Sequence, residues 1–271
     1  MSTPNTLIHL SWRALAGASV EDCLVAFLCG GLVRMGFHRK LLRDKFIRWL
    51  DAHARDGEVS MRLRLKGHEV CLLMRQGNLA DYAIGGEMLW GAYESPSVKP
   101  ATIVDGGANI GMFAIVAHAR FPGTPIICYE PDTDNLLQLE RNLKINQVPA
   151  KVVPKGLWSS ETTLYFHPGL SYTGYIDQTP SEFPIACTTP EISEGCWLKL
   201  DIEGSEYEVL PQVLKQSVKP AFISMEIHQN DTAGAGLVRQ LESAGYRLRT
   251  PHDPSPDCVT IDADREAPVS R

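Results

Sequence analysis

Two segments of the chain combine residue types suited to holding a nucleotide-like cofactor. The first follows a short apolar run and reads Asp-Gly-Gly-Ala-Asn-Ile-Gly at residues 105–111. Its glycines allow the backbone to approach a ligand closely, and the helix expected after it offers unpaired N–H groups. The second is Tyr-Glu-Pro at residues 129–131, where Glu130 could accept hydrogen bonds from both hydroxyls of a ribose. Together they favour an adenosine-type cofactor; the alternative for Glu130 is a helix N-cap charge near Asp132.

Two further segments place charged and imidazole side chains at strand ends. Residues 197–206 (Trp-Leu-Lys-Leu-Asp-Ile-Glu-Gly-Ser-Glu) put Lys199 and Asp201 on one face of a strand, because side chains alternate along it. Met-Glu-Ile-His at residues 225–228 does the same for Glu226 and His228. Buried strands rarely end in so many charges unless the charges are used, and histidine readily accepts a proton near neutral pH. We therefore expect catalysis here; a histidine with only a surface or core role is the alternative.

The elements that must position these residues alternate between strand and helix from residue 96 onward. We expect strands at 101–105, 125–130, 151–156, 196–201, 221–227, 246–250 and 258–261, with helices at 109–120, 132–146, 205–216 and 232–244. This alternation is typical of a parallel sheet with crossover helices, in which ligands lie at the carboxyl ends of the strands. The predicted fold class is therefore α/β, with a doubly wound, three-layer arrangement of seven strands. Residues 159–195 interrupt the alternation with a strand at 162–166, and form either a substrate lid or a plain surface loop.

The first part of the chain has a different pattern. Residues 7–54 show helical spacing, 58–65 and 69–75 indicate two strands joined by a turn at 66–67, and 81–93 are ambiguous. Residues 1–75 hold 12 Lys and Arg against 7 Asp and Glu, in a chain whose net charge is −6. We expect an N-terminal helical and hairpin extension (1–95), a cofactor-binding domain (96–262) and a frayed tail (263–271). The basic extension either packs on the acidic remainder, or uses residues 1–80 for peripheral membrane contact or homo-oligomerisation.

The composition narrows the class of protein. A chain of 271 residues with 44% hydrophobic and 21% charged residues can form a sizeable core, which excludes a disordered chain or a disulfide-stapled miniprotein. Its acidic balance argues against nucleic acid as a partner. The seven cysteines are odd in number and include no Cys-x-x-Cys pair, so we expect reduced thiols without a zinc framework. No targeting signal or transmembrane segment is apparent, and a cytoplasmic location is expected.

Taken with Asn-Leu-Lys-Ile-Asn at residues 142–146, the four segments resemble the FkbM family of S-adenosylmethionine-dependent methyltransferases, over about residues 93–246. The resemblance implies a class I methyltransferase fold, Rossmann-like, with seven strands of which the last is antiparallel. It implies that residues 105–111 wrap the methionine part of the cofactor, that Glu130 holds the ribose, and that residues 156–159 lie beside the adenine, where Trp158 either stacks or fills the core. The implied cofactor contacts are Asp105, Gly106, Gly107, Ala108, Asn109, Gly111, Glu130, Pro131, Leu157, Trp158 and Asp201.

The resemblance also implies the reaction. Its default is O-methylation of a hydroxyl on a small molecule, such as a sugar, a glycan or another natural product, with S-adenosylhomocysteine as the second product. In such an in-line displacement the protein mainly aligns the acceptor and helps to remove its proton. The expected catalytic groups are His228 and Asp201, held by Lys199 or Glu226. In a less favoured version, Asp201, Glu203, Glu226 and His228 grip a divalent cation, magnesium or manganese, that acidifies the hydroxyl.

Three other functions remain open. A nicotinamide dehydrogenase could use the same sheet, although Ala108 breaks the Gly-x-Gly-x-x-Gly pattern of dinucleotide binding. A non-catalytic binding or scaffold protein could retain the cofactor pocket without turnover. A membrane-associated enzyme acting on a lipid-linked glycan could use the basic, partly apolar first 50 residues.

Overall fold

The computed structural model of the chain describes residues 19–35, 40–65, 68–90, 93–167, 175–228, 232–249 and 258–265. These residues belong to two compact units. The N-terminal unit consists of Met1–Ala92, Ile110–Pro122 and Leu137–Val148. The sheet unit consists of Tyr93–Asn109, Gly123–Leu136 and Pro149–Arg271.

The sheet unit contains a seven-stranded sheet in the order β12-β13-β11-β10-β3-β4-β5. Strands β3, β4, β5, β10 and β11 run parallel, whereas β13 is antiparallel to both of its neighbours, β11 and β12. Every residue of β10 is buried, as expected for a parallel strand covered on both faces. The expected α/β fold, doubly wound with an antiparallel last strand, is confirmed. The strands are β3 (Thr102–Gly106), β4 (Ile126–Tyr129), β5 (Ala150–Val153), β10 (Cys196–Leu200), β11 (Phe222–His228), β12 (Tyr246–Leu248) and β13 (Cys258–Arg265).

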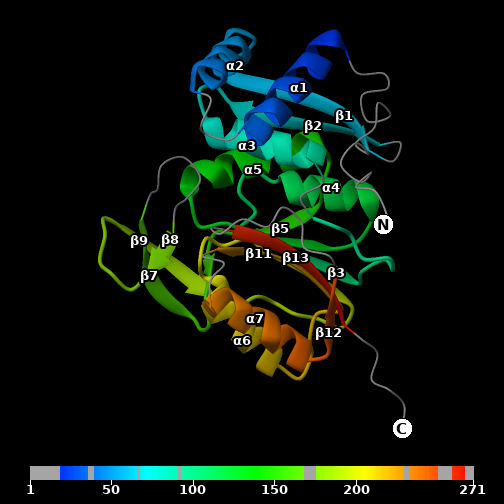
Figure 1. Cartoon of the computed structure of the whole chain (residues 1–271), viewed down its shortest axis with the longest axis vertical. Helices are drawn as coiled ribbons and strands as arrows, with labels where there is room; N and C mark the ends of the chain where they lie inside the picture. The colour runs from blue at the N-terminus through cyan, green and yellow to red at the C-terminus, as the bar shows by residue number, and fades with distance from the viewer. Residues whose placement is uncertain are drawn as a thin grey trace. The chain divides into compact units, whose positions relative to one another are not determined.

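Two helices of the sheet unit, α6 (Glu206–Lys215) and α7 (Thr232–Ser243), lie together on one face of this sheet (Figure 1). Their apolar side chains form one core cluster with the strands. The helices contribute Val209, Leu210, Val213, Leu237 and Leu241, and the strands contribute residues such as Leu198, Leu200, Ile223, Met225 and Ile261. This core fixes the carboxyl ends of β10 and β11, where the sequence predicts the functional groups.

The segment after β5 differs from the prediction. We expected one strand over residues 151–156, but the structure divides it into β5 and β6 (Gly156–Leu157), which belong to different sheets. Pro154 lies between them and has no N–H to donate to a strand ladder, which explains the break. Residues 159–195 are more structured than a surface loop: β7 (Thr162–His167), β8 (Tyr175–Asp177) and β9 (Phe183–Thr188) join β6 in a four-stranded sheet of order β6-β9-β7-β8.

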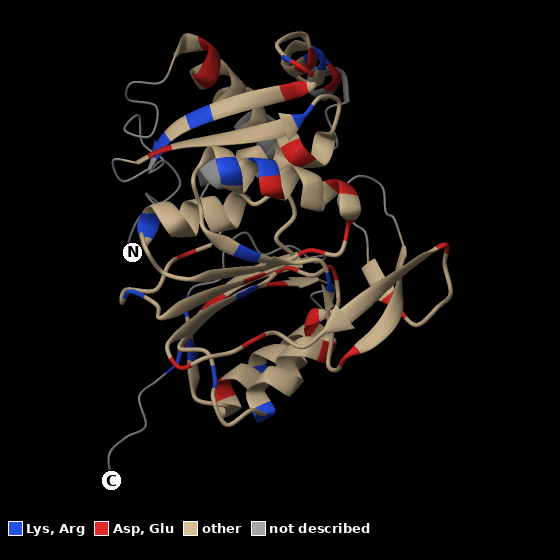
Figure 2. Cartoon of the chain, turned by 180° about the vertical axis from the view of Figure 1, so that it is seen from behind, with Lys and Arg blue, Asp and Glu red and all other residues tan. Residues whose placement is uncertain are grey.

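The N-terminal unit contains α1 (Val20–Met35), α2 (Lys40–Ala52), the antiparallel hairpin β1 (Glu58–Leu65) and β2 (His68–Arg75), α3 (Leu79–Trp90) and α4 (Met112–Arg120). The ambiguous residues 81–93 are thus mostly helical. The side chain of Asn78 caps α3, accepting from the backbone N–H groups of Ala80 and Asp81. Figure 2 shows acidic and basic residues interspersed along α2 and the hairpin.

Helix α5 (Thr133–Ile145) begins at the predicted cap, because Asp132 Oδ1 accepts from the N–H of Asn135 at 2.8 Å. Its last turns belong to the N-terminal unit and supply an unusual partner for the outer edge of β2. The amide of Asn142 bonds both the N–H and the C=O of Leu73, and the amide of Asn146 does the same for Cys71. Two side-chain amides therefore occupy an edge where a third strand would otherwise pair.

Several expectations fall at the limits of the described residues. The helical pattern was expected from residue 7, and residues 1–18 and 36–39 lie outside the described part of the chain. The closing strand continues through Arg265, past the expected domain end at residue 262, because it pairs with both β11 and β12; residues 266–271 also lie outside the described part. Among the described residues, no helix is long and apolar enough to cross a membrane.

Candidate functional site

The loop after β3 is held tightly against neighbouring strand ends. The N–H groups of Gly107 and Ala108 both donate to the carbonyl oxygen of Tyr129, at 3.1 and 2.9 Å. Gly107 has a φ of 74°, and a Cβ built on it would lie 1.8 Å from the carbonyl oxygen of Asp201. Glycine at 107 is therefore required by the packing of the protein itself. A Cβ on Gly106 would lie 2.6 Å from Cδ1 of Leu157, so a larger residue there would require the Leu157 side chain to shift.

Glu130 joins this loop to the segment after β4. Its side chain is buried, and its two oxygens accept from the N–H groups of Asn109 (2.8 Å) and Asp132 (2.9 Å). Burial raises the pKa of Glu130 to about 7, although the two backbone hydrogen bonds oppose the shift. Both the predicted position beside the loop and the alternative contact with Asp132 are present. The buried Oδ1 of Asn109 has no hydrogen-bond partner in the described part of the protein, which leaves a polar atom beside Glu130 for a ligand.

Lys199 is buried beneath the loop, 3% exposed. Its Nζ donates to the carbonyl oxygens of Gly106 (3.1 Å) and Gly107 (2.7 Å), and lies 3.3 Å from Asp105 Oδ1 and 3.7 Å from Asp201 Oδ2. Burial alone would lower its pKa, but the charges of Asp105 and Asp201 raise it. The side chain thus stays charged and fixes the loop. Lys199 or Glu226 was expected to hold His228 and Asp201, and Lys199 does lie beside Asp201.

Asp201 lies immediately after β10, at the carboxyl edge of the sheet. Its backbone N–H donates to the carbonyl oxygen of Gly106 (3.2 Å), and its Oδ2 accepts from the hydroxyl of Tyr93 (2.9 Å). Tyr93 was not among the predicted site residues. It lies between the predicted hairpin and the first strand predicted for the cofactor-binding domain (101–105), so no strand-end rule indicates it.

His228 ends β11 and lies among acidic side chains. Its Nε2 lies 3.3 Å from Glu203 and 3.9 Å from Glu226, and its Nδ1 lies 3.2 Å from Glu206. Ligand atoms of Asp201, Glu203 and His228 fall within 4.8 Å of one another. The expected meeting of Asp201 and His228 therefore occurs, within a larger acidic cluster.

The charges of this cluster decide whether His228 can act as the expected general base. Burial lowers the pKa of His228, but the hydrogen bond and charge of Glu206, together with the charge of Glu203, raise it to about 10. In turn, burial and the charges of Asp201 and Glu226 raise the pKa of Glu203 to about 8, although His228 opposes this shift. Burial and Asp201 also raise the pKa of Glu226. At neutral pH the imidazole is therefore charged and cannot accept a further proton.

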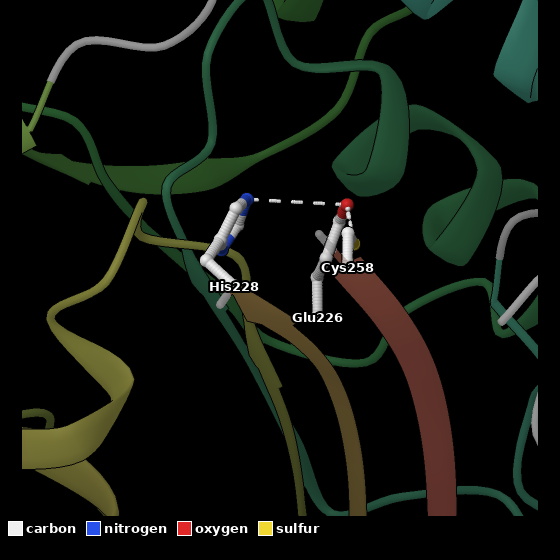
Figure 3. Close-up of side chains that lie close together, drawn as sticks. All are labelled: Glu226, His228 and Cys258. Atoms are coloured by element: carbon white, nitrogen blue, oxygen red, sulfur yellow. Dashed lines mark hydrogen bonds and ion pairs between the residues drawn. The ribbon is translucent and has the colours of Figure 1, made fainter. Parts of the chain in front are cut away.

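Two members of the cluster were missed. Glu206 is fully buried at the start of α6, where its carboxylate accepts from the N–H groups of Ile202 and Gly204. Its place in a helix's first turn predicts an exposed N-terminal charge, and only the tertiary fold shows its burial. Cys258, on β13, donates from its thiol to Glu226, as Figure 3 shows. Among the remaining predicted contacts, Trp158 is half-buried and its backbone N–H donates to the carbonyl oxygen of Thr188. Pro131 is half-buried, and Gly111 (φ 91°) is the N-cap of α4.

Comparison with known proteins supports one family. The model of the methyltransferase FkbM domain matches residues 105–248, more than half of the chain. "Methyltransferase 1" of Beauveria bassiana (strain ARSEF 2860) is 24% identical over 148 residues, which are 43% of this chain and 59% of that protein.

Two solved structures align with the chain at lower sequence identity than the Beauveria protein does. Methyltransferase FkbM from Methylobacillus flagellatus KT aligns with a TM-score of 0.44 and 16% identity, over 83% of this chain and 60% of that chain. TYW2 of M. jannaschii, in complex with AdoMet, aligns with a TM-score of 0.42 and 15% identity, over 79% and 89%. The chain thus spans about 60% of the length of the Beauveria relative and of the Methylobacillus structure. With its seven-stranded sheet, glycine loop and matched motifs, the chain belongs to the FkbM methyltransferase family and has the class I methyltransferase fold.

Proposed function

We propose that this protein is an S-adenosylmethionine-dependent methyltransferase that methylates a hydroxyl group of a sugar, glycan or other natural product. Family membership supports the methyl transfer. The observation that carries the cofactor assignment is the link between the glycine loop and the next strand end, in which Asn109 N–H donates to Glu130. This link places a buried carboxylate and the unpartnered Oδ1 of Asn109 side by side.

The residues present fit this cofactor. Glu130 offers acceptor oxygens suited to ribose hydroxyls, and Asn109 offers a further acceptor in a buried setting. The cofactor supplies an electrophilic methyl group on a sulfonium, which is already a good leaving group. The chain's part is to hold the loop rigid, which Lys199 does from below through two carbonyl contacts, and to orient and deprotonate the acceptor.

For the deprotonation we propose the carboxylate of Asp201 as the proton acceptor, with His228 as its charged neighbour. Both lie at the carboxyl edge of the sheet with their ligand atoms within 4.8 Å. The carboxylates around His228 keep its imidazole protonated, so it suits stabilising a developing anion better than accepting a proton. Tyr93 bonds Asp201 and orients its carboxylate.

The test is calorimetric titration of the protein with S-adenosylmethionine and S-adenosylhomocysteine, comparing wild type with Glu130→Ala. We expect binding in the micromolar range that the substitution abolishes. Glu140→Ala is the matched control, because Glu140 is an exposed glutamate on α5 and its loss should leave binding unchanged. Absence of binding to wild type, or binding of NADH in its place, would refute the cofactor assignment.

A second step tests the reaction. Once binding is established, transfer of a labelled methyl group to a panel of sugars and other alcohols identifies the acceptor class. Asp201→Asn should lower kcat by a larger factor than it weakens S-adenosylhomocysteine binding, because Asp201 is also an implied cofactor contact. Cofactor binding without transfer to any hydroxyl, but with transfer to amine or thiol acceptors, would contradict the O-methylation proposal while leaving the cofactor assignment intact.

A further inference from the structure

Three side chains of different chemistry meet on one face of the antiparallel pair β11 and β13. His228 lies directly opposite Cys258 in the strand register, and Glu226 lies two residues away on β11, opposite Thr260. Because alternate residues share a face, the imidazole, thiol and carboxylate all project to the same side. Their ligand atoms lie within 4.8 Å of one another. Figure 3 shows the three side chains close together at the ends of the two strands. The sheet, rather than a loop, fixes their backbone positions.

The imidazole of His228 is already oriented as a ligand. Its Nδ1 is 3.2 Å from Oε1 of Glu206, a fully buried carboxylate that is itself fixed by the N–H groups of Ile202 and Gly204. Nδ1 therefore carries a proton, and Nε2 faces Glu226 at 3.9 Å and Glu203 at 3.3 Å. A histidine whose other ring nitrogen donates to a carboxylate is the usual arrangement around protein-bound metals.

The charge around these groups also favours a cation. Four carboxylates, from Asp201, Glu203, Glu206 and Glu226, surround the one imidazole, each either fully or largely buried. Oxygens of Glu203, Glu206 and Glu226 each lie within 3.9 Å of an imidazole nitrogen, so these carboxylates, when charged, repel one another over short distances. A bound divalent ion relieves this repulsion.

We propose that Glu226, His228 and Cys258 bind one divalent transition-metal ion, through a carboxylate oxygen, Nε2 and the thiolate. One oxygen, one nitrogen and one sulfur ligand suit Zn²⁺ best, and three protein ligands leave a fourth position open. Asp201 and Glu203 share His228 in a second group of the same compactness, so either carboxylate, or the hydroxyl of an acceptor, can fill that position. Binding releases to solvent the protons of the Cys258 thiol and of Nε2.

This site differs from the magnesium or manganese alternative considered from the sequence, whose ligands are carboxylates and the imidazole of His228, because it includes a thiolate. A Cys-x-x-Cys pattern does not predict this site, because Cys258 lies opposite His228 on a neighbouring strand that comes 30 residues later in the sequence. The metal proposal does not require the cofactor assignment, because none of the three ligands holds the loop at residues 105–109 or Glu130. With the metal bound, its positive charge takes the place of the protonated imidazole of His228 beside Asp201.

The experiment titrates chelator-treated full-length protein with CoCl₂ and records its absorption spectrum. We expect one equivalent of Co²⁺ to produce a thiolate-to-cobalt charge-transfer band, and ZnCl₂ to displace it. Cys258→Ser should remove the band, whereas Cys23→Ser should retain it, since Cys23 is a comparably half-buried cysteine on α1. Loss of a ligand should weaken Zn²⁺ binding at least as much as loss of an outer partner does, so Glu226→Gln should lower the affinity by about tenfold or more.

The wild-type spectrum decides the outcome even if a variant fails to fold. A wild-type protein that binds no Co²⁺, or binds it without a thiolate band, overturns the proposal, and so does a band that survives in Cys258→Ser. Titration of the same samples with S-adenosylhomocysteine separates this result from the proposed function. Cofactor binding with no metal band refutes the metal site alone, and a metal band without cofactor binding refutes the cofactor assignment alone.

Discussion

Replacing Lys199 with methionine tests how the loop at residues 105–109 is held. Methionine keeps much of the volume but leaves the fully buried Asp105 carboxylate, and the carbonyls of Gly106 and Gly107, facing a thioether instead of an ammonium. Removing one partner of a buried ion pair costs about 3–5 kcal/mol, a large part of the roughly 5–15 kcal/mol by which domains are stable. We therefore expect the free energy of unfolding to fall by about 3–5 kcal/mol.

The assay is urea unfolding followed by circular dichroism and tryptophan fluorescence. Adding Asp105→Asn to Lys199→Met should recover a substantial part of the loss, because the buried charge is then removed as well. The control is Lys151→Met, which breaks an ion pair with Glu191 that is more than half exposed on both sides, and should cost no more than about 1 kcal/mol. If Lys199→Met is no more harmful than this control, or if the double variant recovers nothing, Lys199 does not stabilise the loop through its charge.

Three further outcomes follow from the geometry. Burial raises the pKa of Glu130 to about 7, and ribose hydroxyls would favour its ionised form. Binding of S-adenosylhomocysteine should therefore release a proton from Glu130 and weaken as the pH falls below 7. Calorimetry in buffers of different ionisation enthalpy measures this release, and an affinity that does not change between pH 6 and pH 8 would contradict it. Gly107→Ala should lower the free energy of unfolding by about 3 kcal/mol or more, because the added Cβ would meet the Asp201 carbonyl. Gly204→Ala is the control: Gly204 has a φ of 96° but open space around its Cβ, so the change should cost only about 1–3 kcal/mol of backbone strain. Equal losses in urea unfolding would show that the contact with Asp201 is unimportant. Asn142→Ala leaves buried backbone groups without their partners and should cost about 2–4 kcal/mol, and a change under 1 kcal/mol in the same assay would exclude a stabilising role.

The sequence predicted the main sheet well because its signals are local. Apolar runs, turn residues and the Asp132 cap lie within a few residues of the elements that they define, and the first hairpin strand was placed at its observed limits, Glu58–Leu65. The division at Pro154 was missed because the predicted strand was extended through the proline to Gly156. The four-stranded sheet of β6 to β9 was missed because only its Thr162 strand has a strong pattern, and its other strands form by pairing with that one.

The candidate site was partly predictable for a topological reason. Parallel strands bring their carboxyl ends to one edge, so Asp201 and His228 could be expected to meet without knowledge of any side-chain contact. The contacts of Lys199 and Cys258 could not be predicted in this way, because they depend on side-chain partners and on strand register. Lys199 points beneath the loop, and strand alternation gives its face but not its partner. Cys258 meets His228 through the register of an antiparallel pair, which the sequence pattern does not specify.

The amide contacts of α5 with the edge of β2 have a consequence for biosynthesis. Asn142 and Asn146 lie 69 and 75 residues beyond the backbone groups that they bond. At about 5–20 residues per second, ribosomes need about 4–15 s to synthesise that interval, during which the edge of the nascent hairpin has no amide partners. An unpaired strand edge is a template for association with other chains. The yield of this protein should therefore depend on chaperone occupancy and translation speed over residues 76–146.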